Sequence, residues 1–367
     1  MGGRSDRIAT TWVRTANLTD TRMTTGSSIP DSDAEKQKLV RHLGTFDPNI
    51  RFPTPYVAFA GRPSSQIFDH GWHYDALGYR NDVAAGPRRK DETLRVFIVG
   101  DSTLVDGLTN DDTVPGRVQI LLRQKFGAGA HVYNFGAISS CLNQSMMLTT
   151  MRLINLEPDV IVVLGGGTDT FQPWTFDPRP GNPYNTFAIE AICDELFTQD
   201  HHERRASNFS LESVQDLMFE RLRNLRLITR WKDPAWEWEV VRKFELAVDR
   251  LGRLSKGIAL PVHFILQPMV VRKSSPTENE KSFASEEFLN YLNRQYERLK
   301  IVTSGYNMKY GTRNFFSIHD LSDAFAEIDE QIFTDIVHYN DIGRQIMANK
   351  IFNLIGPSDD ISCISNL

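Results

Sequence analysis

The chain lacks the features that mark several classes of protein. Its 367 residues include only three cysteines, Cys141, Cys193 and Cys363, too few and too scattered for a disulfide framework or a zinc site. No uninterrupted apolar run is long enough to cross a bilayer. The formal charge of -5, together with the absence of any Lys/Arg-rich run, argues against a nucleic-acid-binding surface.

The N-terminal residues also lack the apolar core of a secretory signal. Unless a leader has been removed from the sequence, we therefore expect a cytoplasmic protein with no nucleic-acid or membrane partner. His70 and His73 are close in sequence, but no third ligand accompanies them, so no metal site is expected. The sequence does not indicate an oligomeric state.

The composition is that of a globular protein, with 41% hydrophobic and 24% charged residues. The composition and the periodicity of apolar residues change along the chain, and these changes predict four regions. These are a loosely ordered N-terminal arm (1–45), an aromatic preface of loops and short strands (46–92), an α/β domain (93–357) and a C-terminal tail (358–367).

The α/β domain is predicted from an alternation of short β-rich apolar runs with amphipathic helical segments. The strands are expected at 95–99, 131–135, 159–164, 262–266 and 315–318, and helices at 114–126, 144–156 and 340–355. This alternation predicts a doubly wound, mainly parallel five-stranded sheet of the flavodoxin-like type. Such sheets place their sites beyond the carboxyl ends of the strands.

The connection between the third and fourth strands, at about 171–260, is much longer than usual. Helical periodicity appears there at 187–196, 211–227 and 236–254, and we interpret the segment as a helical insertion that forms a wall or lid of the site. Its aromatic residues have a plainer interpretation, in which they fill a small core of the insertion itself.

Two sequence motifs carry the candidate chemistry. Gly100-Asp101-Ser102 follows the apolar run Val96–Val99, and Asp335-Ile336-Val337-His338 lies near the other end of the chain. A serine at the end of a buried strand, with an Asp and a His three residues apart, can provide a nucleophile, its base and the group that orients the base. The plainer alternatives are a Ser102 that caps the following turn and an Asp335–His338 pair that is purely structural.

Two further motifs fall between these in sequence, Asn134-Phe135-Gly136 and Gly166-Gly167-Thr168-Asp169. The order of the four resembles that of the SGNH, or GDSL-type, hydrolases, and the resemblance covers residues 94 to about 355. It implies a serine esterase in which Ser102 attacks the ester carbonyl, His338 transfers the proton and Asp335 orients the imidazole. It also implies that the backbone N–H groups of Ser102 and Gly136 bind the oxyanion.

One position departs from the family pattern. Where the family has an Asn whose amide donates to the oxyanion, this chain has Thr168. Three explanations are open: the Thr168 hydroxyl donates instead, Asn143 or another group fills the gap, or the protein has drifted towards slow transfer or binding. Asp169, Trp174 and Arg80 are further candidates for substrate binding, although a structural salt bridge is an alternative role for Arg80.

The preface sequence Trp72–Asn81 and the run Phe264-Ile265-Leu266-Gln267-Pro268 resemble SGNH proteins associated with polysaccharide assembly. We therefore expect an acetylesterase acting on a carbohydrate or related metabolite, with no cofactor. An O-acyltransferase with the same triad, a weakly active SGNH-fold binding protein and a lipid esterase remain alternatives.

Overall fold

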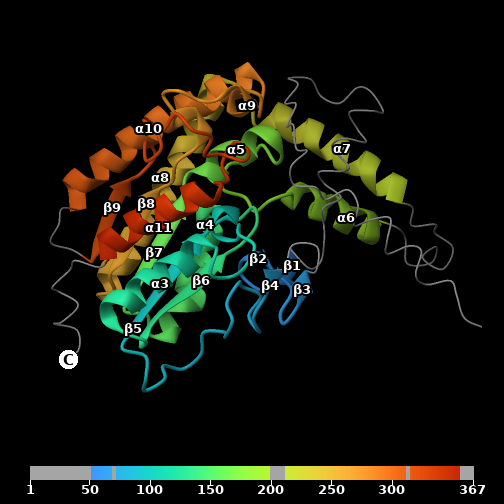
Figure 1. The fold of residues 1–367 in the computed structure, drawn as a ribbon. Coiled ribbons are helices and arrows are strands. Elements are labelled where there is room, and N and C mark those ends of the chain that lie inside the picture. The colour runs from blue at the N-terminus through green and yellow to red at the C-terminus, as the bar shows by residue number, and fades with distance from the viewer. Residues whose placement is uncertain (1–50, 68–71, 199–210, 311–314, 356–367) are drawn as a thin grey trace, which may run out of the picture.

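The computed structural model describes residues 51–67, 72–198, 211–310 and 315–355. The predicted N-terminal arm and C-terminal tail lie outside these ranges. Five parallel strands form the central sheet, in the order β6-β5-β7-β8-β9 (Figure 1). Their bounds are Leu94–Gly100 (β5), Ala130–Gly136 (β6), Val160–Gly165 (β7), Val262–Leu266 (β8) and Phe316–Asp320 (β9).

The sheet register brings the sequence motifs to one edge. β5 and β7 are buried along their whole length, as expected for central strands of a parallel sheet covered on both faces. Gly100 pairs with Gly136 at the ends of β5 and β6. The residues that follow these strands, including Ser102, therefore leave the sheet at its carboxyl edge.

Helices cover both faces of the sheet (Figure 1). α3 (Val114–Phe126) and α11 (Asp341–Ile355) pack together on one face. α4 (Leu142–Met151), α8 (Pro234–Ile258) and α10 (Glu286–Tyr310) cover the other. The fold is thus the doubly wound α/β architecture that the alternation of strands and helices predicts.

The long connection between β7 and β8 divides into two parts. α5 (Gly167–Thr175) and α8 pack into the main core, where Phe244 of α8 meets Phe264 of β8 edge to face. α6 (Thr186–Thr198) and α7 (Leu211–Ile228) pack on each other around a small separate core that includes Phe187 and Leu222. The segment that stands apart from the sheet is therefore the α6–α7 pair, which is shorter than the expected insertion.

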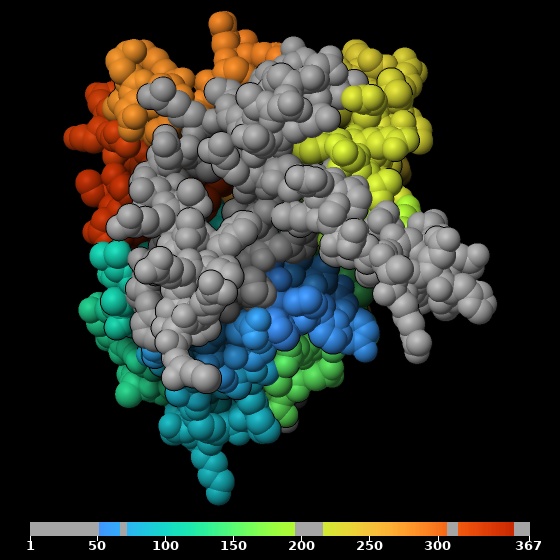
Figure 2. Space-filling model, turned by 90° about the vertical axis from the view of Figure 1, so that its right-hand side faces the viewer, coloured from blue at the N-terminus to red at the C-terminus, as the bar shows by residue number. Residues whose placement is uncertain are grey.

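The preface forms two small antiparallel ribbons. β1 (Phe52–Thr54) pairs with β2 (Ala58–Ala60), and β3 (Gln66–Ile67) pairs with β4 (Trp72–His73). The chain then returns to the edge strand β6, where the Asn81 amide bonds both the N–H (2.7 Å) and the carbonyl (3.0 Å) of Asn134. This side chain completes the edge of the sheet as a neighbouring strand would. In Figure 2 the ribbons form the blue surface region.

The remaining elements are short. They comprise α9 (Glu278–Lys281) and 3₁₀ turns at Ser102–Leu104, Leu153–Leu156 and Val270–Arg272. Within the described ranges, no helix is long and apolar enough to cross a membrane.

Candidate active site

The structure brings Ser102, His338 and Asp335 into one chain of hydrogen bonds. The Ser102 Oγ lies 2.7 Å from His338 Nε2, and His338 Nδ1 lies 2.6 Å from Asp335 Oδ2. Ser102 begins the turn after β5, whereas the other two residues precede α11. A separation of 236 residues in sequence is therefore closed at the carboxyl edge of the sheet.

The Asp335–His338 loop is shaped by its own backbone. The second carboxylate oxygen, Asp335 Oδ1, accepts the N–H groups of Val337 and His338, both at 2.8 Å. These bonds fold the loop back on itself and point the imidazole towards Ser102. The Asp-x-x-His spacing thus lets one carboxylate hold both the loop and the ring.

The pair is electrostatically coupled. Burial disfavours the imidazolium, but the charge of Asp335 and its hydrogen bond outweigh burial and raise the pKa of His338 above the ordinary histidine value. Asp106 and Asp101 add to this effect. Burial also disfavours the Asp335 carboxylate, yet His338 and the two backbone donors lower the pKa of Asp335 to about 2.

Asp101 lies behind the nucleophile and is only 2% exposed. Its Oδ1 accepts the Thr103 N–H at 3.0 Å and the Thr103 hydroxyl at 2.8 Å, which closes the turn around Ser102. Its Oδ2 accepts the hydroxyl of Thr168 at 2.7 Å and the side-chain amide of Gln267 at 3.0 Å.

Of the three groups expected to bind the oxyanion, the Gly136 N–H and the Thr168 hydroxyl are engaged in other hydrogen bonds. The Gly136 N–H donates to Asn134 Oδ1 at 2.8 Å, and the Thr168 hydroxyl donates to Asp101. Each has only one hydrogen to donate, so neither is free for an oxyanion in this arrangement. The sequence identified the residues but could not show these competing acceptors.

Other backbone N–H groups near the strand ends remain available, among them those of Ser102 and Ser139. Across the described residues, neither the Ser102 N–H nor the Ser139 N–H has an intramolecular acceptor. Ser139 lies in the turn after β6 with φ 61°, a left-handed conformation that is uncommon outside glycine. Gln172 holds this turn by donating to the Ser139 carbonyl at 2.9 Å. A serine gives no sequence signal for such a backbone, so the sequence analysis missed it.

The four candidates for substrate binding serve structural contacts. Asn143 donates its amide to the Gly181 carbonyl at 3.0 Å. Asp169 accepts the N–H groups of Leu142 (2.9 Å) and Gly166 (3.1 Å), joining the starts of α4 and α5, and burial raises the pKa of its carboxyl to about 6. Both side chains therefore hold the scaffold around the strand ends.

Trp174 and Arg80 are buried. Trp174 is 3% exposed and stacks on Tyr291 with ring centroids 4.3 Å apart, within the main core. The Arg80 guanidinium donates to the carbonyls of Val105 and Gly107, and it forms no salt bridge with the other residues that the structure describes. Burial lowers the pKa of Arg80 to about 10. Arg80 thus supports the loop that follows the nucleophile.

No metal centre is found in the part of the chain that the structure describes, where no cluster of three or more His, Cys, Asp or Glu side chains could hold an ion. His73 belongs to β4, and His70 lies outside the described residues. A separate histidine pair, His263 and His319, bridges β8 and β9 with ring nitrogens 3.0 Å apart.

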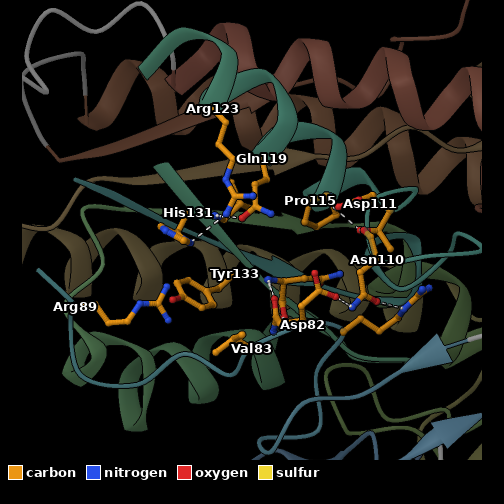
Figure 3. Close-up of a pocket in the computed structure, with 16 residues that line it drawn as sticks. Asp82, Val83, Arg89, Asn110, Asp111, Pro115, Gln119, Arg123, His131 and Tyr133 are labelled. Carbon is orange, nitrogen blue, oxygen red and sulfur yellow. Dashed lines mark hydrogen bonds between the residues drawn. The ribbon is translucent and has the colours of Figure 1, made fainter. Parts of the chain in front are cut away.

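A cavity of about 200 Å³ lies beside the edge strand β6, under α3 (Figure 3). It is lined by charged and polar side chains, among them Arg89, Arg123, His131, Asp82 and Asp111. Ser102, His338 and Asp335 are not among its lining residues. The candidate site is therefore defined by its hydrogen bonds and not by this cavity.

The comparisons with known proteins give distant structural likenesses only. No protein-family model matches the chain, and no curated protein matches it. An acetyl xylan esterase structure is 14% identical, with a TM-score of 0.42 over 71% of this chain and 100% of that one. A catalytic mutant of an acetylxylan esterase from Geobacillus stearothermophilus is 13% identical (TM-score 0.41, 72% and 94% covered). A GDSL-like lipase from Bacteroides thetaiotaomicron is 12% identical (TM-score 0.39, 75% and 92% covered). Likeness at this level carries no conclusion about function.

Proposed function

We propose that the protein is a serine esterase of the SGNH type. The observation that carries this proposal is the continuous chain from Ser102 Oγ through His338 to Asp335, with links of 2.7 and 2.6 Å. A serine hydroxyl is a weak nucleophile until a neighbouring base accepts its proton. The elevated pKa of His338 and its contact with Asp335 suit the imidazole to that task.

In the proposed reaction, Ser102 Oγ attacks the ester carbonyl carbon while its proton passes to His338 Nε2. The tetrahedral oxyanion is bound by the N–H groups of Ser102 and Ser139, neither of which has an acceptor among the described residues. His338 then returns the proton to the departing alcohol, leaving an acyl group on Ser102. Water, activated by His338, releases the acid and restores the serine.

The substrate we propose is a small acyl ester, an O-acetyl group on a carbohydrate or related metabolite. The proposal rests on the preface and fourth-strand sequences that resemble polysaccharide-associated proteins. Rates on p-nitrophenyl acetate and p-nitrophenyl octanoate test the acyl size. A faster rate on the octanoate would favour a lipid esterase instead.

A second candidate is a weakly active binding protein with the same fold. The engaged Gly136 N–H and Thr168 hydroxyl favour it, because loss of one oxyanion donor typically lowers turnover by about 100- to 1000-fold. It would retain a reactive serine but turn over slowly.

The first experiment compares p-nitrophenyl acetate hydrolysis by the wild type and the Ser102→Ala variant at pH 8. Ser255→Ala is the matched control, because Ser255 is a buried serine of α8 that donates to the Leu260 carbonyl. We expect Ser102→Ala to abolish hydrolysis and labelling by a fluorophosphonate, and Ser255→Ala to retain both. Equal wild-type and Ser102→Ala rates would refute the esterase. Stoichiometric labelling with negligible turnover would favour the weakly active protein.

A further inference from the structure

The strongest unassigned feature near the candidate site is the buried carboxylate of Asp101 with its four donors. Burying a carboxylate is costly unless hydrogen bonds replace its water. Two of these donors come from Thr103, and the other two from residues outside the turn, Thr168 and Gln267. The latter two are 1% and 0% exposed.

The donors come from different elements. Thr168 lies in the first turn of α5, just after β7, and Gln267 directly follows β8. The Gln267 backbone N–H also donates to the Gly165 carbonyl at 3.1 Å. One carboxylate oxygen therefore joins the carboxyl ends of β5, β7 and β8.

The local sequence makes room for this arrangement. A Cβ on Gly167 would lie 2.4 Å from Gln267 Nε2, so a glycine is needed before Thr168 for the amide to reach Asp101. Gln267 Oε1 is buried without a partner, whereas its nitrogen faces the carboxylate. The reversed amide would place oxygen against oxygen, so Asp101 fixes its orientation.

We propose that Thr168 and Gln267 are positioning residues that hold Asp101, and through Asp101 the nucleophile Ser102, in the reactive orientation. Ser102 lies between Asp101 and Thr103, and Thr103 donates two hydrogen bonds to the Asp101 carboxylate. Fixing that carboxylate from the side of β7 and β8 leaves the serine little freedom to turn from His338. Thr168 thus acts on the nucleophile and not on the oxyanion. The inference rests on the proposed esterase function.

A double-mutant cycle separates the two roles of Thr168. Thr168→Val removes the hydroxyl but keeps the branched shape, Thr168→Ser keeps the hydroxyl, and Asp101→Ala removes its acceptor. The rate at which a fluorophosphonate phosphonylates Ser102, with release of fluoride, is measured for each variant and for the Asp101→Ala/Thr168→Val double variant, under conditions where all are folded. Thr303→Val is the control, because the Thr303 hydroxyl is also buried but donates within α10, to the Lys300 carbonyl.

We expect Thr168→Val to slow phosphonylation of Ser102 by about 10- to 100-fold, the range for one hydrogen bond to a buried charge. Thr168→Ser should recover most of this rate, and Thr303→Val should leave it unchanged. In the Asp101→Ala background, Thr168→Val should have no further effect. An equal loss in both backgrounds would show that Thr168 acts independently of Asp101, as an oxyanion donor would, and would overturn the inference. So would an unchanged rate in Thr168→Val.

Urea unfolding is also measured for the four proteins of the cycle, which are the wild type, Thr168→Val, Asp101→Ala and the double variant. This measurement makes failure of the inference distinguishable from failure of the proposed esterase function. If Ser102 is not labelled even in the wild type, the proposed function fails. If the change in unfolding midpoint of the double variant differs from the sum of the two single changes, Asp101 and Thr168 interact. If it equals that sum, the contact on which the inference depends does not contribute, and the inference fails.

Discussion

The candidate site has two sides that differ in how completely they are assembled. On the proton-transfer side, Ser102, His338 and Asp335 already form short, aligned hydrogen bonds. On the oxyanion side, two of the three groups that the family resemblance implies, the Gly136 N–H and the Thr168 hydroxyl, donate to Asn134 and Asp101 instead. Possession of a motif residue therefore does not ensure that its donor is available.

The difference has a physical origin. A triad depends on side chains that reach across a cleft, and the sheet register with one tight loop places them. An oxyanion hole depends on where single hydrogens point, and any closer acceptor redirects them. The four predictions below act on these two sides, beginning with the largest expected effect on turnover.

The largest effect is expected from Asp335→Asn on the proton-transfer side. Its amide can still accept the loop N–H groups, but it cannot stabilise the imidazolium and favours the wrong histidine tautomer. We expect kcat to fall by about 10⁴-fold, as for comparable triads, with little change in the unfolding midpoint. The measurement is steady-state hydrolysis of p-nitrophenyl acetate. A loss below tenfold would mean that Asp335 only shapes the loop.

The next effect is expected from Gln172→Met on the oxyanion side. Gln172 fixes the Ser139 carbonyl, and the methionine has similar size but no donor. We expect kcat to fall by about tenfold through the loss of one buried hydrogen bond, with a smaller change in KM. Thr175→Val is the control on the same helix, since the Thr175 hydroxyl donates to the Phe171 carbonyl of α5. Equal rates in the two variants would exclude Ser139 as a donor.

The sequence predicted individual strands and helices better than the contacts between them, because the signals of single elements are local. Val114–Phe126 and Val262–Leu266 were predicted with the bounds observed, and Ser102 lies just beyond a strand at the expected place. In contrast, α10 was not predicted, and α8 was assigned to the insertion although it packs on the sheet. Hydrophobic periodicity identifies a helix but does not show which other element of the fold the helix packs against. Likewise, the role of Gln267 depends on a contact with a distant segment, Asp101, and such a contact has no sequence signature.

The pH profile probes the electrostatics of the proton-transfer side. His338 must be neutral to accept a proton, and its raised pKa places the acid limb of kcat/KM above pH 6.5. Asp106 contributes to this shift and lies 3.2 Å from Arg344. Asp106→Asn should therefore move the limb to lower pH, by a fraction of a unit, and increase relative activity at pH 6. Glu239→Gln, which removes a partly exposed carboxylate of α8, is the control. An acid limb of kcat/KM that moves to higher pH or does not shift would contradict the effect of Asp106 on the pKa of His338.

The smallest effect is expected from Asn143→Ala, which returns to the oxyanion side. Asn143 was a candidate to replace the missing family donor, but its amide nitrogen bonds the Gly181 carbonyl. We expect the variant to lose about 1 kcal/mol of unfolding free energy from that hydrogen bond, and to keep kcat within about threefold. Urea unfolding and p-nitrophenyl acetate kinetics measure the two quantities. A loss of kcat near 100-fold would mean that the Asn143 amide turns towards the oxyanion when substrate binds. The oxyanion side would then be completed by the substrate, whereas the proton-transfer side is complete before it arrives.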